Sequence, residues 1–201
     1  MILAYHAVFT TYGFWLPNDP RGSWSDFVRA WELLHFGKAT KTDSRRSVAR
    51  KPHDVQWRQA AKERLKYPPV VLDGGQALAV GKGFEQAIDE SGYRVLACSI
   101  LPEHVHLVIR CHERKPEQIV SHLKARATQR LKSEGRHPLA AFAAEDGSIP
   151  SPWARRAWVV YIDREERVPK TIEYVESNPV REGKKSQRWG FVEPYSAPDW
   201  H

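Results

Sequence analysis

The order in which strand and helix patterns follow one another is the feature that most restricts the fold of this chain. Segments rich in β-branched and aromatic residues predict four strands, at residues 4–11, 93–100, 104–111 and 157–163. Apolar residues at helical spacing predict helices at residues 76–91 and 116–134. Only Leu101–Glu103 separate the second strand from the third, which leaves room for a hairpin turn and nothing more. The order β-α-β-β-α-β predicts an α+β fold of the ferredoxin-like or RRM-like kind, in which two helices cover one face of an antiparallel four-stranded sheet.

Two further segments lie outside this pattern. Residues 24–69 contain no strand pattern and predict an insert after the first strand, with a short helix from the capping residue Asp54 to Tyr67. A last helix is expected at residues 169–177, because proline suits a first helical turn and Pro179 should stop the helix. This helix is free to lie on the other face of the sheet. We expect a single domain over residues 1–201, with the insert at about 24–69 and the C-terminal helix and tail at about 165–201.

The charge of the chain favours a polyanionic partner. Lys and Arg number 31 against 24 Asp and Glu, a net charge of +7, and the excess is confined to residues 38–66, where ten basic residues face three acidic ones. A localised excess favours phosphate binding, although a solvated basic loop is the alternative. Several of the eight tryptophans lie beside cations, a pairing suited to stacking bases, while most tryptophans of any protein are core residues. The candidate DNA-binding residues are Arg45, Arg46, Arg50, Lys51, Arg58, Lys124, Arg126, Arg130, Arg155 and Arg156.

Other classes of protein are disfavoured. No uninterrupted apolar run approaches the about 18–20 residues of a membrane helix, and the N-terminus lacks the basic lead-in of a secretory signal. The two cysteines, Cys98 and Cys111, cannot form a disulfide framework. We therefore expect a cytoplasmic protein with no membrane partner.

Two histidines in the third strand form a candidate metal site. Side chains alternate along a strand, so His104 and His106 face one side while Val105 and Leu107 face the other. Two imidazoles about 7 Å apart can converge on one divalent ion. Glu103 should face away from them, in the turn. Such a triplet alone is weak, since two surface histidines on a half-exposed strand would give the same pattern.

A second candidate group lies in the last predicted helix. Tyr174 and Asn178 are four residues apart and share one helical face. A carboxamide oxygen suits Mg²⁺ or Mn²⁺, and a phenol can be a nucleophile. Taken separately, a core tyrosine and a helix-ending asparagine explain these residues as well. Together with the paired histidines on the open sheet face, the functional interpretation is the better one.

These segments resemble a known family. ILPEHVHLVIR at residues 100–110, followed by YVESNPVREG at residues 174–183, resembles the single-tyrosine HUH transposases, and most closely the REP-associated tyrosine transposases. The resemblance implies that His104, His106 and Asn178 bind Mg²⁺ or Mn²⁺ and that Tyr174 is the nucleophile. It also implies a metal-dependent endonuclease and strand transferase that acts on single-stranded or hairpin DNA through a 5′-phosphotyrosine link.

The resemblance leaves several points open. The insert is longer than in the smallest family members, so its role is not implied. The chain could be a monomer or a homodimer, and a prokaryotic, nucleoid-associated location is expected. The main alternative is a non-catalytic hairpin-DNA-binding module or domesticated repressor on the same fold. A less favoured one is an unrelated metallohydrolase that uses the histidine pair, with a carboxylate as third ligand and no protein adduct.

Overall fold

The computed structural model describes residues 1–42 and 48–196 of the chain. Two of the candidate DNA-binding residues, Arg45 and Arg46, lie outside the described residues. Within the described ranges, no helix is both long enough and apolar enough to span a membrane.

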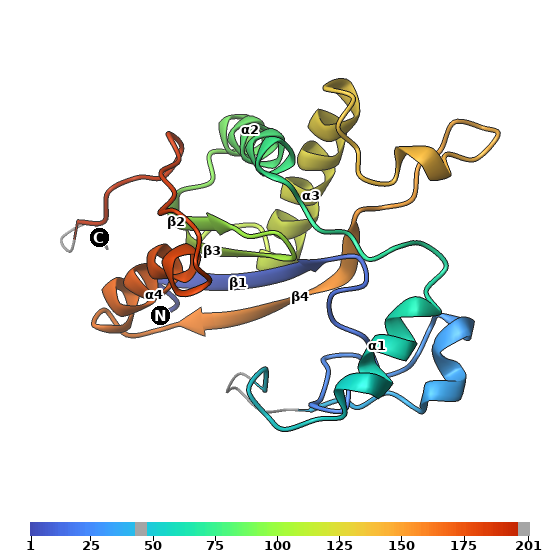
Figure 1. Ribbon diagram of the computed structural model, residues 1–201. Coiled ribbons are helices and arrows are strands. Elements are labelled where there is room, and N and C mark those ends of the chain that lie inside the picture. The colour runs from blue at the N-terminus through green and yellow to red at the C-terminus, as the bar shows by residue number, and fades with distance from the viewer. Residues whose placement is uncertain (43–47, 197–201) are drawn as a thin grey trace.

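The centre of the fold is a four-stranded antiparallel sheet (Figure 1). Its strands are β1 (Ala4–Thr11), β2 (Val95–Ile100), β3 (His104–Arg110) and β4 (Trp153–Ile162), in the order β2-β3-β1-β4. This order confirms the predicted ferredoxin-like topology. β4 begins four residues earlier than predicted, because after a register shift in β1 Trp153 still pairs with Thr11.

Two helices cover one face of the sheet, α2 (Gly74–Ser91) and α3 (Pro116–Ser133) (Figure 1). Asp73 caps α2 by accepting a hydrogen bond from the backbone N–H of Gln76. The two helices cross closely at Gly83, where a Cβ would lie 2.5 Å from the Cα of Ala127. The apolar side chains of α2 and α3 pack with those of the strands into the main core.

The last helix, α4 (Arg167–Arg181), packs on β2 and β3 from the other face (Figure 1). Val168 and Val175 bury their side chains there against Val108 of β3. The prediction that Pro179 stops this helix is wrong, because the helix continues through Pro179 to Arg181. Proline removes one backbone donor, but Pro179 is itself buried, and the N–H of Glu182 still bonds the carbonyl of Asn178. Packing on the sheet therefore holds the last turn in place.

The insert forms a separate layer beside the ends of β1 and β4 (Figure 1). It contains a 3-10 helix (Trp31–Phe36) and α1 (Val55–Glu63), which ends four residues before the predicted end at Tyr67. A small core of Leu16, Leu33 and Ala61 lies between them.

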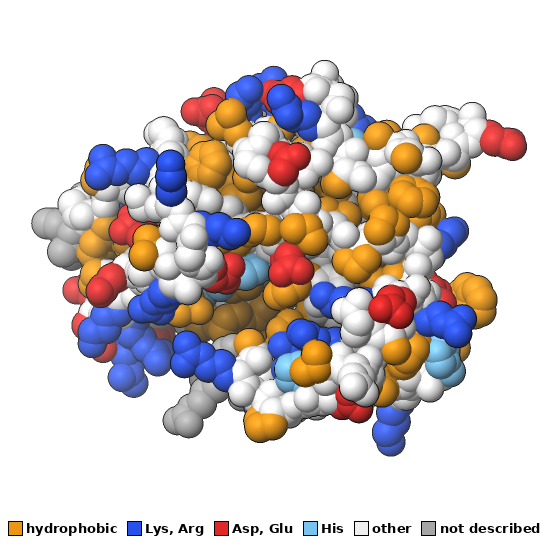
Figure 2. Space-filling view, viewed as in Figure 1, with side chains coloured by type: hydrophobic (Ala, Val, Ile, Leu, Met, Phe, Trp, Pro, Cys, Tyr) orange, Lys and Arg blue, Asp and Glu red, His pale blue; other side chains and the backbone are white. Residues whose placement is uncertain are grey.

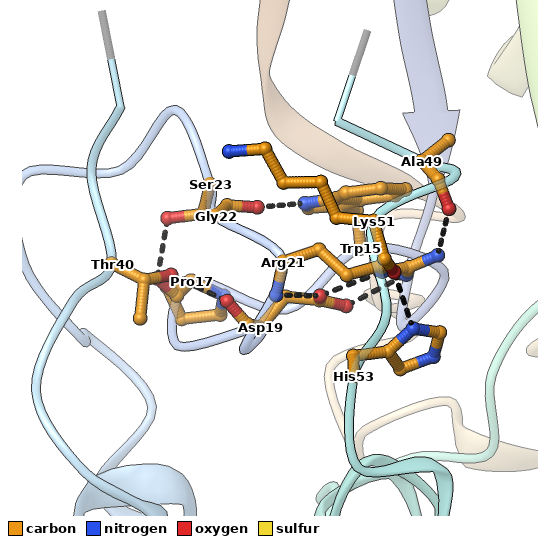
Figure 3. A network of polar contacts seen from close by, with 10 residues as sticks. All are labelled: Trp15, Pro17, Asp19, Arg21, Gly22, Ser23, Thr40, Ala49, Lys51 and His53. Atoms are coloured by element: carbon orange, nitrogen blue, oxygen red, sulfur yellow. Dashed lines mark hydrogen bonds and ion pairs between the residues drawn. The ribbon is translucent and has the colours of Figure 1, made fainter.

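A buried ion pair anchors the start of this layer (Figure 3). The carboxylate of Asp19 accepts two hydrogen bonds of 2.8 Å from the guanidinium of Arg21. That guanidinium lies 3.9 Å from the ring centroid of Trp15 and donates to the carbonyl of Ala49. Because Ala49 lies 28 residues after Arg21, this hydrogen bond links the start of the insert to the segment just before α1.

The chain after α4 runs along the outer edge of β2. The side chain of Gln187 accepts a hydrogen bond from the N–H of Ile100 and donates one to its carbonyl, at 2.8 and 2.7 Å. Further on, Val192 forms a parallel bridge with Val95. The hydrogen-bonding groups of this edge are thus partly satisfied from within the chain.

Candidate active site

The paired histidines of β3 face α4. Alternation places Val105 and Leu107 in the core under α2 and α3, while Val108, on the same face as the histidines, packs against α4. The ring centroids of His104 and His106 are 5.0 Å apart. His106 is buried, at 7% exposure, and His104 is half-buried.

A third histidine, His6 of the central strand β1, joins this pair. Its Nε2 lies 3.2 Å from Nδ1 of His106, and the two rings stack with centroids 5.4 Å apart. His6 is not among the site residues predicted from the sequence. Alternation in AYHAVFTT places it opposite the buried Ala7 and Phe9, but only the pairing of β1 with β3 brings it beside His106.

Tyr174 and Asn178 of α4 line the same space, together with Glu182, the residue that caps the end of the helix. Residues four and eight apart lie on one helical face. The ring centroid of Tyr174 is 5.9 Å from that of His106 and 5.8 Å from that of His6. Two turns later, Oε1 of Glu182 lies 3.3 Å from Nε2 of His104. Asn178 is one turn from each of them and is 7% exposed. The helix therefore lays a phenol, a carboxamide and a carboxylate along the histidines.

Burial keeps these histidines uncharged. It lowers the pKa of His106 to about 2, with smaller contributions from the neighbouring His104 and His6. Burial also lowers the pKa of His6 to about 4, and that of His104 below its ordinary value. Burial raises the pKa of Glu182. Neutral imidazoles keep the lone pair that metal coordination needs.

The side chains present fit a divalent cation. Nδ1 of His104 is buried and has no hydrogen-bond partner within the described residues. Two imidazoles with the carboxamide oxygen of Asn178 make a mixed donor set of the kind that suits Mn²⁺ or Mg²⁺. In the part of the chain that the structure describes, no three His, Cys, Asp or Glu side chains are arranged to hold a metal.

Aromatic rings flank the histidines on two sides. Phe14, just after β1, stacks on His104 with centroids 5.4 Å apart, and the ammonium of Lys62 lies 5.5 Å from its ring. On the other side, the ring of Trp158 of β4 lies edge-to-face with that of His6, with centroids 5.8 Å apart. Figure 2 shows a histidine side chain above a hollow floored by hydrophobic side chains, with Lys and Arg around it. The hollow is open to solvent, and Tyr174 is 39% exposed.

The candidate DNA-binding residues of α3 lie on the opposite face of the sheet from the histidines. The ammonium of Lys124 is buried and donates to the carbonyl of Ala154 at 2.8 Å. Arg126 forms an ion pair with Glu90 at 2.7 Å, and Arg130 lies 3.9 Å from Glu134. The structure thus does not bring these three cations to the candidate site.

The remaining described candidates lie on the insert and β4. Arg50 and Lys51 are exposed, and Lys51 lies beside the Asp19–Arg21 pair in Figure 3. Arg58 is half-buried on α1. Arg155 and Arg156 are exposed on β4, and Arg156 bonds the insert through Trp24 and Asp26.

A sheet with paired histidines on one face, crossed by a helix that carries a tyrosine, is an arrangement suited to the DNA chemistry of transposases. The family model described as IS200-like transposase matches residues 62–178, which is more than half of the chain. The chain belongs to the IS200-like transposase family. As a member of that family it is a DNA-cleaving enzyme. The match includes His104, His106, Tyr174 and Asn178, whereas His6 and most of the insert precede it.

Two solved structures are similar to the chain. One is a REP-associated tyrosine transposase bound to a REP hairpin, with 14% identity over 94% of this chain and 74% of that chain, and a TM-score of 0.46. The other is a protein from Deinococcus radiodurans R1 described as a transposase, with 14% identity over 88% and 91% of the two chains and a TM-score of 0.43. No curated protein matches the chain.

Proposed function

We propose that this transposase is a metal-dependent single-stranded DNA endonuclease and strand transferase that acts at hairpin or palindromic elements through a 5′-phosphotyrosine intermediate. The observation that carries the proposal is the position of Tyr174, whose exposed ring lies within 6 Å of the rings of both His6 and His106. A phenol beside neutral, metal-competent imidazoles has the chemistry of a nucleophile at a phosphodiester. The REP hairpin bound by one structural relative is consistent with this class of substrate.

The chemistry follows from the side chains. His104, His106 and Asn178 would hold Mg²⁺ or Mn²⁺, which when bound polarises a non-bridging oxygen of the scissile phosphate. The oxygen of Tyr174 attacks the phosphorus, and the bond from phosphorus to the 3′ oxygen breaks. The leaving oxygen takes up one proton and the phenol loses one, so the step is balanced. Because the ester is exchanged rather than hydrolysed, a 3′-OH can reverse the step and join strands without ATP.

Other side chains of this hollow serve the same reaction. The guanidinium of Arg181 lies 5.4 Å from the ring centroid of Tyr174, where it can offset phosphate charge. When Nδ1–H of His106 donates to Nε2 of His6, this hydrogen bond fixes the orientation of the His106 ring and leaves the lone pair of its Nε2 for the cation.

A covalent-adduct assay tests the proposal. The protein is incubated with 3′-labelled hairpin-bearing single strands and Mn²⁺, and a labelled protein band is sought on a denaturing gel. Tyr174→Phe should abolish the band, and a chelator should do the same. Tyr161→Phe is the matched control, since Tyr161 is also exposed but its ring meets Tyr5 instead. An undiminished adduct in Tyr174→Phe would refute the proposal, and hairpin binding indifferent to both chelator and Tyr174→Phe would select the non-catalytic module.

A further inference from the structure

The insert and β4 bring two tryptophans together beside the histidines. The rings of Trp24 and Trp158 stack with centroids 5.5 Å apart and an interplanar angle of 24°. The ring centroid of Trp158 is in turn 5.8 Å from that of His6, with the two rings 69° apart. A two-indole stack thus begins one ring away from the candidate catalytic side chains.

These two indoles differ from a structural tryptophan in the same strand. Trp153 is 5% exposed, packs on Phe9 in the main core and donates its indole N–H to Thr128. Trp24 and Trp158 are both half-buried, and no hydrogen bond from either indole N–H is found within the described residues. Large apolar rings left partly in water next to a catalytic hollow are available to a ligand.

Ion pairs fix the segment that carries Trp24. The guanidinium of Arg156 donates to the carbonyl of Trp24 at 3.1 Å and to the carboxylate of Asp26 at 2.7 Å. The other oxygen of Asp26 pairs with Lys41. The insert is therefore attached to β4 at this point by Arg156, which lies two residues before Trp158 in the same strand.

We propose that Trp24 and Trp158 form a nucleobase-stacking site for the single-stranded DNA substrate. The inference rests on the proposed function, because it places a base of the strand next to the phosphate that Tyr174 attacks. Aromatic rings near a basic side chain suit both parts of a nucleotide. The base stacks on the rings, and the phosphate is attracted by the positive charge. The insert, most of which lies outside the match to the family model, would then form one wall of the hollow that holds the DNA strand.

The test compares two ligands that carry the same phosphates. Binding of a fluorescein-labelled oligothymidylate and of an abasic strand of equal length is measured by anisotropy, with chelator and in the Tyr174→Phe background so that no cleavage occurs. The unsubstituted chain should prefer the thymidylate strand. Trp24→Leu and Trp158→Leu should each reduce that preference by about 5- to 100-fold. Trp24→Phe should retain most of it.

A matched control and the outcomes of the test are as follows. Trp31→Leu should leave the preference unchanged, because Trp31 belongs to the same insert and is 79% exposed on its 3-10 helix. The inference is overturned if the unsubstituted chain does not distinguish the two strands, or if both Trp→Leu variants keep the full preference while melting normally. If the unsubstituted chain forms the adduct in the covalent-adduct assay but the Trp→Leu variants keep the strand preference, the stacking site alone is refuted. If the Trp→Leu variants lower the preference but the unsubstituted chain forms no adduct, the stacking site is upheld and the proposed chemistry is refuted.

Discussion

Lys124 offers a test of how the main core is built, because its charge is buried beside the sheet. Its ammonium lies 4.9 Å from the ring centroid of Phe9 and donates to the carbonyls of Ala154 and Arg156. Burial lowers the pKa of Lys124 from 10.5 to about 8. A base whose pKa is lower in the folded state binds fewer protons there than in the unfolded chain, so between about pH 8 and 10.5 the stability rises with pH.

The expected size follows from that shift. At neutral pH the charged ammonium costs the fold about 3 kcal/mol, and at about pH 9.5 only about 1 kcal/mol of that cost remains, since each pKa unit is about 1.4 kcal/mol. Relative to Lys124→Met, the unsubstituted chain should therefore gain about 2 kcal/mol of unfolding free energy between these two conditions. Tyr5, whose pKa is raised to about 12 by burial, titrates in both proteins and cancels in the comparison.

Urea unfolding at the two pH values measures this difference. Lys132→Met is the control, because Lys132 is exposed on the same helix, and its unfolding curves should shift with pH in parallel with those of the unsubstituted chain. If the unfolding free energy of Lys124→Met changes with pH in parallel with that of the unsubstituted chain, the ammonium is not desolvated and the reasoning is refuted. The single-strand affinity of Lys124→Met should stay unchanged, because the ammonium faces away from the candidate site.

Two further predictions concern the catalytic side chains and the helix crossing. His6→Phe keeps a ring in place but removes the hydrogen bond to His106, so the affinity for Mn²⁺, measured by calorimetry, should fall about 10- to 100-fold, and an unchanged affinity would contradict the positioning role of His6. Gly83→Ala places a methyl group 2.5 Å from the Cα of Ala127 and should cost at least about 2 kcal/mol in urea unfolding. Gly74→Ala, which meets no atom within 4 Å, should be neutral or slightly stabilising, and equal effects of the two substitutions would argue against close helix packing.

The sheet could be predicted from the sequence because its signals are local. β1 has the predicted bounds, and the hairpin of β2 and β3 follows from a three-residue gap. Strand alternation likewise predicted that His104 and His106 share a face, and helical spacing predicted the same for Tyr174 and Asn178. Each of these inferences needs only the period of one element.

The remaining features depend on how elements meet. His6 could not be recognised without the pairing of β1 with β3, which no local pattern contains. Lys124 was predicted to bind DNA, yet it lies one turn after the buried Val120 and its ammonium donates to carbonyls of β4. The Trp24–Trp158 stack joins residues far apart in the chain. The surroundings of these residues depend on strand pairing between distant segments and on burial in the folded chain. The propensity of a single residue does not predict either.

The attachment of Gln187 to the edge of β2 bears on how copies of this protein could assemble. A bare outer strand invites another chain to add to the sheet, and here a carboxamide already occupies both backbone groups of Ile100. On the opposite border, Lys124 engages the carbonyls of Ala154 and Arg156 in the same manner. A second copy that extended the sheet at Ile100 of β2, or at Ala154 and Arg156 of β4, would first have to displace the side chain of Gln187 or of Lys124.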